Sequence, residues 1–440
     1  MRVLKVEAVV SIALTACLVT PALGVEMENG PAYLTDSHGA SGVVHAFLEL
    51  SEVAPEYDKY WKGALDWLIS VAKRDEDGYV FWYMSTTAPK GHSSHRVSIP
   101  GMCHEIRMFF AGYKRCGDER YRDMALAGAR TLVEHFARKR QTEYGTAYAW
   151  SHSYRPNDHS AGLLAGHSHG LGNLTDTLLD AYEAAPDEAF KRDLEHALKG
   201  ILINLRLRGT RTEEDGSLLI TWPALKNPKA VETGYCYGQA GLVLPLLRLA
   251  ELLPELKLSD GTTPLSLANG NLRYLMSVAR KAHGGYIWPY MRHSKTSKNI
   301  GYGSGTGGIG WAFLRGAQVN RDADSDFAAE CMTYAKGAAV YAVSLVLSPQ
   351  VPSRRRSPGG EAGFGVCGGA SGGGFLLMQY ANEVGDKEAE FVKRIDAAID
   401  KIARLVIASA TDVDGTLVCP DRSHFNRVNL ALDYGQTGVL

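Results

Sequence analysis

A short motif recurs along this chain of 440 residues: Gly-x-x-Gly followed by an apolar stretch. The first glycines of its seven copies are Gly39, Gly101, Gly170, Gly238, Gly305, Gly369 and Gly435. They lie 62, 69, 68, 67, 64 and 66 residues apart, although His104 and Asn173 replace the second glycine in two copies. Regular spacing over such intervals is typical of a repeat protein, in which each repeat is one supersecondary unit.

Each repeat has the same internal order. The motif opens an apolar helix, and a second segment with one polar face follows it, as at 187–207 and 324–347. A glycine-led turn with a short aromatic or β-branched run, such as GGYIWPYM from Gly284, then precedes the next motif. We therefore predict an all-α fold, an (α/α)7 toroid or barrel of helical hairpins, with short β arms between the repeats.

Residues 25–440 are predicted to form a single toroid domain, because no proline-rich or low-complexity linker divides them. The chain reaches Leu440 just where the seventh inner helix should start. We therefore expect the last of the seven Gly-x-x-Gly repeats to be truncated.

The first 24 residues are predicted to be a signal peptide. Arg2 and Lys5 precede an apolar run, and small residues at 22–24 offer a cleavage site. An alternative is a lipobox ending at Cys17, in which that cysteine would carry lipid. We expect a secreted or periplasmic protein without a membrane span, because no later stretch reaches the roughly 18 apolar residues that a spanning helix needs.

The formal net charge of −1 excludes one class of partner and leaves another open. Nucleic-acid binding requires a basic excess to neutralise phosphates, so we expect no nucleic-acid partner. In a toroid, the inner helices begin together at one end, and their N-terminal N–H groups and dipoles point into a common funnel. Such a funnel favours an anion, so we expect an acidic polysaccharide as the substrate.

The motif YCYG at 235–238 and the motif CGG at 367–369 resemble those of the lanthionine synthetase C-like family over essentially the whole mature chain. The resemblance implies a seven-fold α/α toroid. It also implies a zinc ion, which the family's cyclases hold with a Cys from a WCYG motif and a Cys-His pair from a CHG motif. Cys236 and Cys367 match the two cysteines, whereas Gly368 stands in place of the histidine. We expect no cofactor and keep a zinc protein as an alternative.

Two carbohydrate reactions fit an exported toroid. Hydrolysis needs two carboxyl groups flanking the glycosidic bond, and Glu232 is the best-placed acid near a motif. β-Elimination at a uronate needs a neutraliser for the carboxylate, a base for the C5 proton and an acid for the leaving oxygen. The residues before the motifs are richer in this second set and resemble those of toroidal alginate and glucuronan lyases. We predict a polysaccharide lyase, with a glycoside hydrolase as the alternative.

Four residues are candidates for catalysis. Tyr302 directly precedes the fifth inner helix and is the candidate acid or base, while His169 is a candidate base or carboxylate partner. Asn173 and Arg292 are candidates for neutralising the carboxylate, although Asn173 would equally cap a helix. Further candidates near the funnel mouth, for substrate binding, are His167, Tyr235, Tyr237, Trp288, Tyr290, His293 and Arg96. Trp288 is also a candidate for the core between repeats.

Overall fold

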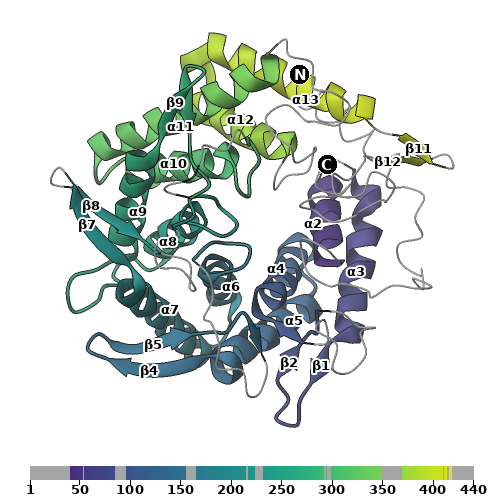
Figure 1. Cartoon of the computed structure of the whole chain (residues 1–440). Helices are drawn as coiled ribbons and strands as arrows, with labels where there is room; N and C mark the ends of the chain where they lie inside the picture. The colour runs from purple at the N-terminus through teal and green to yellow at the C-terminus, as the bar shows by residue number, and fades with distance from the viewer. Residues whose placement is uncertain are drawn as a thin grey trace.

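The computed structural model describes residues 40–52, 54–84, 96–154, 165–214, 217–222, 231–291, 294, 299–348, 369–409, 411–413 and 416–418. Within these residues, six helical hairpins follow one another around a ring, and each contributes one inner and one outer helix (Figure 1). The predicted signal peptide over residues 1–24, the motif at Gly435, and Cys17, Arg292, His293 and Cys367 lie outside the described residues.

The inner helices begin within two residues of the first glycine of each Gly-x-x-Gly motif, as the sequence predicts. They are α2 (Ala40–Ser51), α4 (Ile99–Cys116), α6 (Leu171–Ala184), α8 (Ala240–Leu252), α10 (Thr306–Asn320) and α12 (Ala370–Val384). The outer helices are α3 (Asp58–Val71), α5 (Glu119–Arg130), α7 (Glu188–Arg208), α9 (Pro264–Val278), α11 (Ser325–Leu347) and α13 (Ala389–Ser409). Short one-turn helices, η1 (Pro55–Tyr57), η2 (Thr131–Phe136) and η3 (Gly385–Glu388), adjoin the outer ones.

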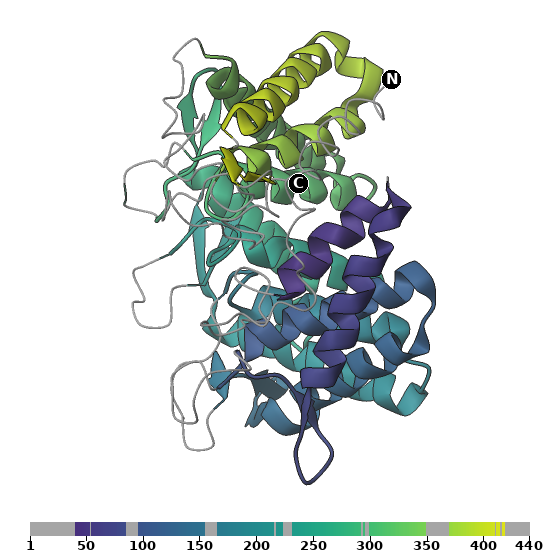
Figure 2. The same cartoon turned by 90° about the vertical axis from the view of Figure 1, so that its right-hand side faces the viewer.

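Short strand pairs separate the repeats. The antiparallel pairs are β1 (Lys73–Arg74) with β2 (Val80–Phe81), β4 (Arg138–Thr142) with β5 (Gly145–Ala149), β7 (Thr210–Glu214) with β8 (Ser217–Thr221), β9 (Arg280–Ala282) with β10 (Gly285–Ile287), and β11 (Thr411–Val413) with β12 (Thr416–Val418). A further pair, β3 (Val97–Ser98) with β6 (Ser153–Tyr154), joins two successive repeats. The strand pairs of the teal and green repeats lie along one side of the molecule (Figure 2). The predicted α/α toroid with short β arms is thus confirmed.

A tryptophan after each of four strand pairs anchors the pair to the outer helix before it. Trp82, Trp150, Trp222 and Trp288 are each at most 2% exposed, and their indole N–H groups donate to the carbonyl oxygens of Leu68, Leu132, Leu205 and Leu275 at 2.8–2.9 Å. A buried indole needs such a partner for its single donor. Trp288 was a candidate for substrate binding, and the structure corrects this: it belongs to the core between repeats.

The motif glycines allow the connections of adjacent repeats to touch. The N–H of His167 donates to the carbonyl of Tyr235 at 2.9 Å, and the N–H of Cys236 donates to the carbonyl of Gly303 at 2.8 Å. A Cβ on Gly241 would overlap the Tyr235 carbonyl oxygen and the His167 nitrogen, both of them backbone atoms that cannot swing aside. The recurrent glycine is therefore a requirement of close backbone approach between repeats.

Gly241→Ala is expected to lower the free energy of unfolding by about 1–3 kcal/mol, because the added methyl must displace backbone of two connections. Urea denaturation measures the change. Gly374→Ala on α12 is the matched control, since its Cβ would lie 3.7 Å from Ile402 Cδ1 in ordinary contact. That variant should gain stability, because alanine is favoured over glycine inside a helix by about 1 kcal/mol. Equal losses in both variants would contradict the close-approach explanation.

None of the helices in the described part of the chain combines the length and apolar character needed to cross a membrane.

Candidate functional site

Three successive repeats place an aromatic ring at the same position, in the connection that leads into the inner helix. His167 precedes α6, Tyr235 precedes α8 and Tyr302 precedes α10. The rings of His167 and Tyr235 stack with centroids 4.7 Å apart and an angle of 24° between planes, and the rings of Tyr235 and Tyr302 are 4.4 Å apart at 55°. We call these three residues the His167 stack.

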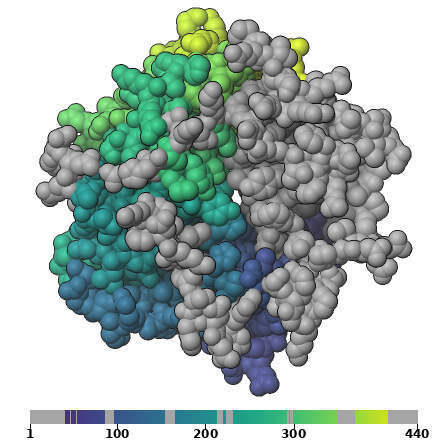
Figure 3. Space-filling model, viewed as in Figure 1, coloured from purple at the N-terminus to yellow at the C-terminus, as the bar shows by residue number. Residues whose placement is uncertain are grey.

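A second row of rings runs beside the first. His169 stacks on Tyr237 with centroids 4.7 Å apart and planes 5° from parallel, and His152 lies 6.0 Å from His169 at 19°. We call these three residues the His169 stack. Between the two stacks, Ser168 Oγ donates to Cys236 Sγ at 3.2 Å. The teal and green repeats, which hold most of both stacks, reach the centre of the face shown in Figure 3.

Below the His167 stack, ion pairs join the three inner helices α4, α6 and α8. Arg107 Nε donates to Asp180 Oδ2 at 3.2 Å, and Arg248 Nη2 donates to Asp180 Oδ1 at 2.7 Å. Asp176, one turn before Asp180, lies 2.9 Å from His167 Nε2 and 3.5 Å from Arg248 Nη1. We call Arg107, Asp176, Asp180 and Arg248 the inner-wall cluster.

The inner-wall cluster keeps Asp176 ionised. Burial of the Asp176 carboxyl would by itself raise its pKa. The hydrogen bond with His167 and the charges of Arg107 and Arg248 outweigh that cost and lower the pKa to about 2. A carboxylate held in this way is a fixed acceptor for its neighbours at all but very acidic pH.

The two tyrosines of the His167 stack are held in their protonated form. Burial raises the pKa of Tyr235 well above its usual value and also raises that of Tyr302, and the charge of Asp176 adds to both effects. The hydroxyl of Tyr235 donates a hydrogen bond to that of Tyr302. Both phenols are therefore proton donors rather than bases at neutral pH.

The surroundings of His152 in the His169 stack favour its neutral imidazole. Burial, together with the positive charge of Arg96, lowers the pKa of His152. On the other side, burial raises the pKa of the Glu232 carboxyl, which shares a hydrogen bond with Tyr290, and the same contact raises the pKa of Tyr290 beyond the effect of its own burial. The site thus combines a guanidinium, an imidazole whose pKa is lowered and a carboxyl group whose pKa is raised.

Most of the described candidates lie at this site, and two of them, Asn173 and Trp288, do not face it. His167, Tyr235 and Tyr302 form one stack, His169 and Tyr237 belong to the other, and Arg96 and Tyr290 border the second stack. Asn173 is fully buried, and its Nδ2 donates to the carbonyl of Pro100 at 3.2 Å. We had expected Asn173 to meet a substrate carboxylate, but in this position its amide ties α6 to α4.

The expected anion site at the N-termini of the inner helices also needs correction. The N–H groups of Asn173, Gln239 and Thr306 donate to carbonyls of the connections before their own helices, at 3.3, 2.9 and 3.0 Å. These three donors are therefore already used within the protein. Positive charge at the described part of the site comes from side chains instead.

Sequence reasoning missed the inner-wall cluster and His152. Asp176 and Asp180 stand four residues apart in a helix that is otherwise mostly apolar, and Arg107 and Arg248 interrupt two further inner helices. A charged residue on a helix expected to be buried all round needs a partner. That signal, followed across repeats, would have pointed to the cluster.

The zinc alternative can be compared with the donors that the structure describes. Cys236 Sγ accepts from Ser168, and among the described residues no three His, Cys, Asp or Glu side chains gather as a ligand set. A zinc site needs at least three protein ligands. The described residues do not fit this group, and no step below uses it; Cys367 lies outside them.

Comparison with known proteins adds evidence on the fold. No protein-family model and no curated protein sequence matches the chain. Among solved structures, nisin cyclase is similar with a TM-score of 0.51 at 14% identity, over 91% of this chain and 88% of that one. A sugar epimerase from a ruminal bacterium has a TM-score of 0.51 at 13% identity, over 80% and 88% of the two chains, and a D-mannose isomerase has 0.49 at 11%, over 90% and 96%. At these identities the first two likenesses establish an α/α toroid and nothing finer.

Proposed function

We propose that this protein is an exported enzyme that acts on carbohydrate and cleaves a uronate-containing polysaccharide, such as alginate or glucuronan, by β-elimination. Since a fold does not decide a function, the proposal depends on the side chains at the site. The observation that carries it is the His169 stack beside Arg96, where a cation adjoins two imidazoles, and the pKa of one of them, His152, is lowered by burial and by that cation. The signal peptide predicted over residues 1–24 fits a polymeric substrate outside the cell.

The residues divide the reaction between them. Arg96 would pair with the uronate carboxylate and stabilise the negative charge that develops on it. The imidazole of His169 would accept the proton from C5, and the electrons of that C–H bond would form the C4–C5 double bond as the C4–O bond breaks. The hydroxyl of Tyr302 would donate its proton to the leaving oxygen. Arg292 and His293 remain predicted to make further contacts with the substrate.

Hydrolysis is the second candidate because of Glu232. Its pKa is raised by burial, which suits a general acid, and Tyr290 holds it by a hydrogen bond. Hydrolysis needs a second carboxyl group across the glycosidic bond. Asp176, the carboxylate that contacts the His167 stack, is already bonded to His167 and paired with Arg248, so elimination has the fuller set of groups.

A panel of alginate, glucuronan and related polyuronates tests the proposal. At least one polymer should give an unsaturated uronate product, seen as a rise in ultraviolet absorbance, and Glu232→Gln should keep most of that activity. Reducing ends released without the chromophore, and abolished by Glu232→Gln, would establish hydrolysis instead. Neither signal with any polyuronate would refute the proposed function.

A further inference from the structure

We propose that Asp176 is a positioning residue that fixes the tautomer of His167, and through it the orientation of the His167 stack. Asp176 lies on α6, below the connection that carries His167, and its Oδ2 is 2.9 Å from His167 Nε2. Both side chains are nearly buried, with exposed fractions of 11% and 8%. The contact is therefore shielded from solvent, where a hydrogen bond to a charged group is strongest.

The geometry selects one tautomer. Arg107 Nη1 also approaches His167 Nε2, at 3.3 Å, and is itself a donor. If Nε2 carried no proton it would accept from Arg107, but two acceptors, Nε2 and the Asp176 oxygen, would then face each other at 2.9 Å. A proton on Nε2 that is donated to Asp176 removes this conflict, because the negative carboxylate attracts both neighbouring donors. The Nδ1 atom of His167 is then the acceptor of the ring.

The orientation of the His167 ring affects the two tyrosines of the His167 stack. Tyr235 packs face to face on the imidazole at 4.7 Å, and the hydroxyl of Tyr235 donates to that of Tyr302. Rotation of His167 would remove the surface that holds Tyr235 and so release the donor that orients Tyr302. The charge of Asp176 also raises the pKa of Tyr302, but its effect on the orientation of Tyr302 passes through His167.

Arg107 and Arg248 hold the carboxylate in turn. Arg248 Nη1 lies 3.5 Å from Asp176 Oδ1, and Arg107 Nη1 lies 4.0 Å from Oδ2. Asp180 provides a matched comparison, because it is on the same helix and bonds the same two arginines, whereas the carboxylate that contacts His167 is that of Asp176. If the inner-wall cluster acted only through its charge or by holding the helices together, replacing Asp176 or Asp180 would have the same effect on His167.

The test is nitrogen NMR of the full chain labelled with 15N-histidine, in which His167→Gln assigns the imidazole signals. In the wild type, His167 should be protonated at Nε2. In Asp176→Asn, the tautomer population should shift toward Nδ1–H, because Arg107 becomes the only charged group beside Nε2, whereas Asp180→Asn should leave it unchanged. A wild-type His167 protonated at Nδ1 would overturn the proposal, and so would equal shifts in the two variants. The first of these outcomes needs only the assigning variant His167→Gln to fold, not the aspartate variants.

The kinetic consequence rests on the proposed function. On a polyuronate that the wild type cleaves, Asp176→Asn should lower kcat on the order of 10²-fold, the size expected when an acid is misplaced. KM should stay within about threefold, because the uronate contacts at the His169 stack remain. An unchanged kcat with a shifted tautomer would refute the link to Tyr302. If no polyuronate is cleaved, the proposed function fails while the NMR result still decides the role of Asp176.

Discussion

His169→Ala is expected to lower kcat/KM on the cleaved polyuronate by roughly 10²- to 10⁴-fold, the usual contribution of a general base. His169 is half-buried and stacks in near-parallel contact on Tyr237, so its ring has a defined orientation. Removing it leaves Arg96 and the tyrosines in place, so substrate should still bind. The loss should therefore fall on kcat, measured as the initial rate of ultraviolet absorbance change, with KM altered far less.

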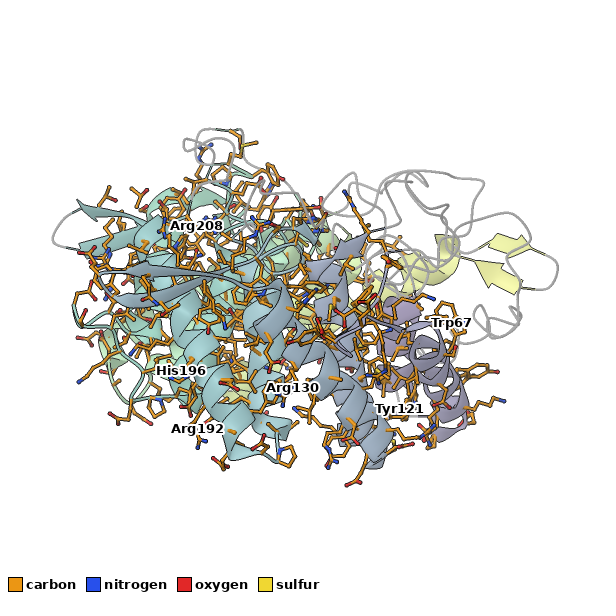
Figure 4. The ribbon with its side chains drawn as sticks, turned by 90° about the horizontal axis from the view of Figure 1, so that it is seen from below. Trp67, Tyr121, Arg130, Arg192, His196 and Arg208 are labelled. Atoms are coloured by element: carbon orange, nitrogen blue, oxygen red, sulfur yellow. The ribbon has the colours of Figure 1, made fainter. Side chains whose placement is uncertain are left out.

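Two controls make this result specific. His196→Ala removes an exposed histidine from the outer helix α7, on the outside of the ring (Figure 4), and should keep wild-type activity. The thermal midpoints of both variants should stay close to that of the wild type, because neither ring is part of the buried core. Retention of wild-type kcat by His169→Ala would remove His169 as the base and leave His152 as the candidate.

Much of the fold follows from the sequence because it depends on backbone geometry. Gly241 is needed because two connections touch there. The same need in other repeats places a glycine at regular intervals along the sequence. The role of Trp288 could not be settled in this way, because an exposed sugar platform and a buried anchor have the same residue type. The structure decides it by the bond from Trp288 to the carbonyl of Leu275.

The site was predictable only where it repeats. His167, Tyr235 and Tyr302 occupy equivalent positions before successive inner helices, so the motif pointed to all three. Asp176 and Arg248 lie within helices and come together only when those helices pack side by side, about 70 residues apart in the chain. Neither residue belongs to the recurring motif, so the pattern that reveals the ring does not reveal its charged inner wall.

Arg248→Met is expected to lower the free energy of unfolding by about 3 kcal/mol, the low end of the cost of breaking a buried ion pair. Arg248 pairs with three acidic groups of α6: Asp176, Asp180 and Glu183. Methionine keeps much of the side-chain volume but removes the charge, so Asp176 and Asp180, whose side chains are only 11% and 12% exposed, lose a neutralising partner. Urea denaturation at neutral pH measures the loss. Arg192→Met, at an exposed position of α7 (Figure 4), should change stability by no more than about 0.5 kcal/mol.

The pH dependence separates lost charge pairing from lost packing. The pKa of Asp176 in the folded protein is lowered to about 2, so its pairing stabilises the fold above the unfolded pKa of about 4 and is lost as the pH falls toward 2. Removing Arg248 raises that folded pKa, so the variant lacks part of this contribution at neutral pH. The stability gap between wild type and Arg248→Met should be full above about pH 5 and narrow steadily toward pH 2. A gap that stays constant over this range would mean that packing of the Arg248 side chain, rather than its charge, stabilises the inner wall.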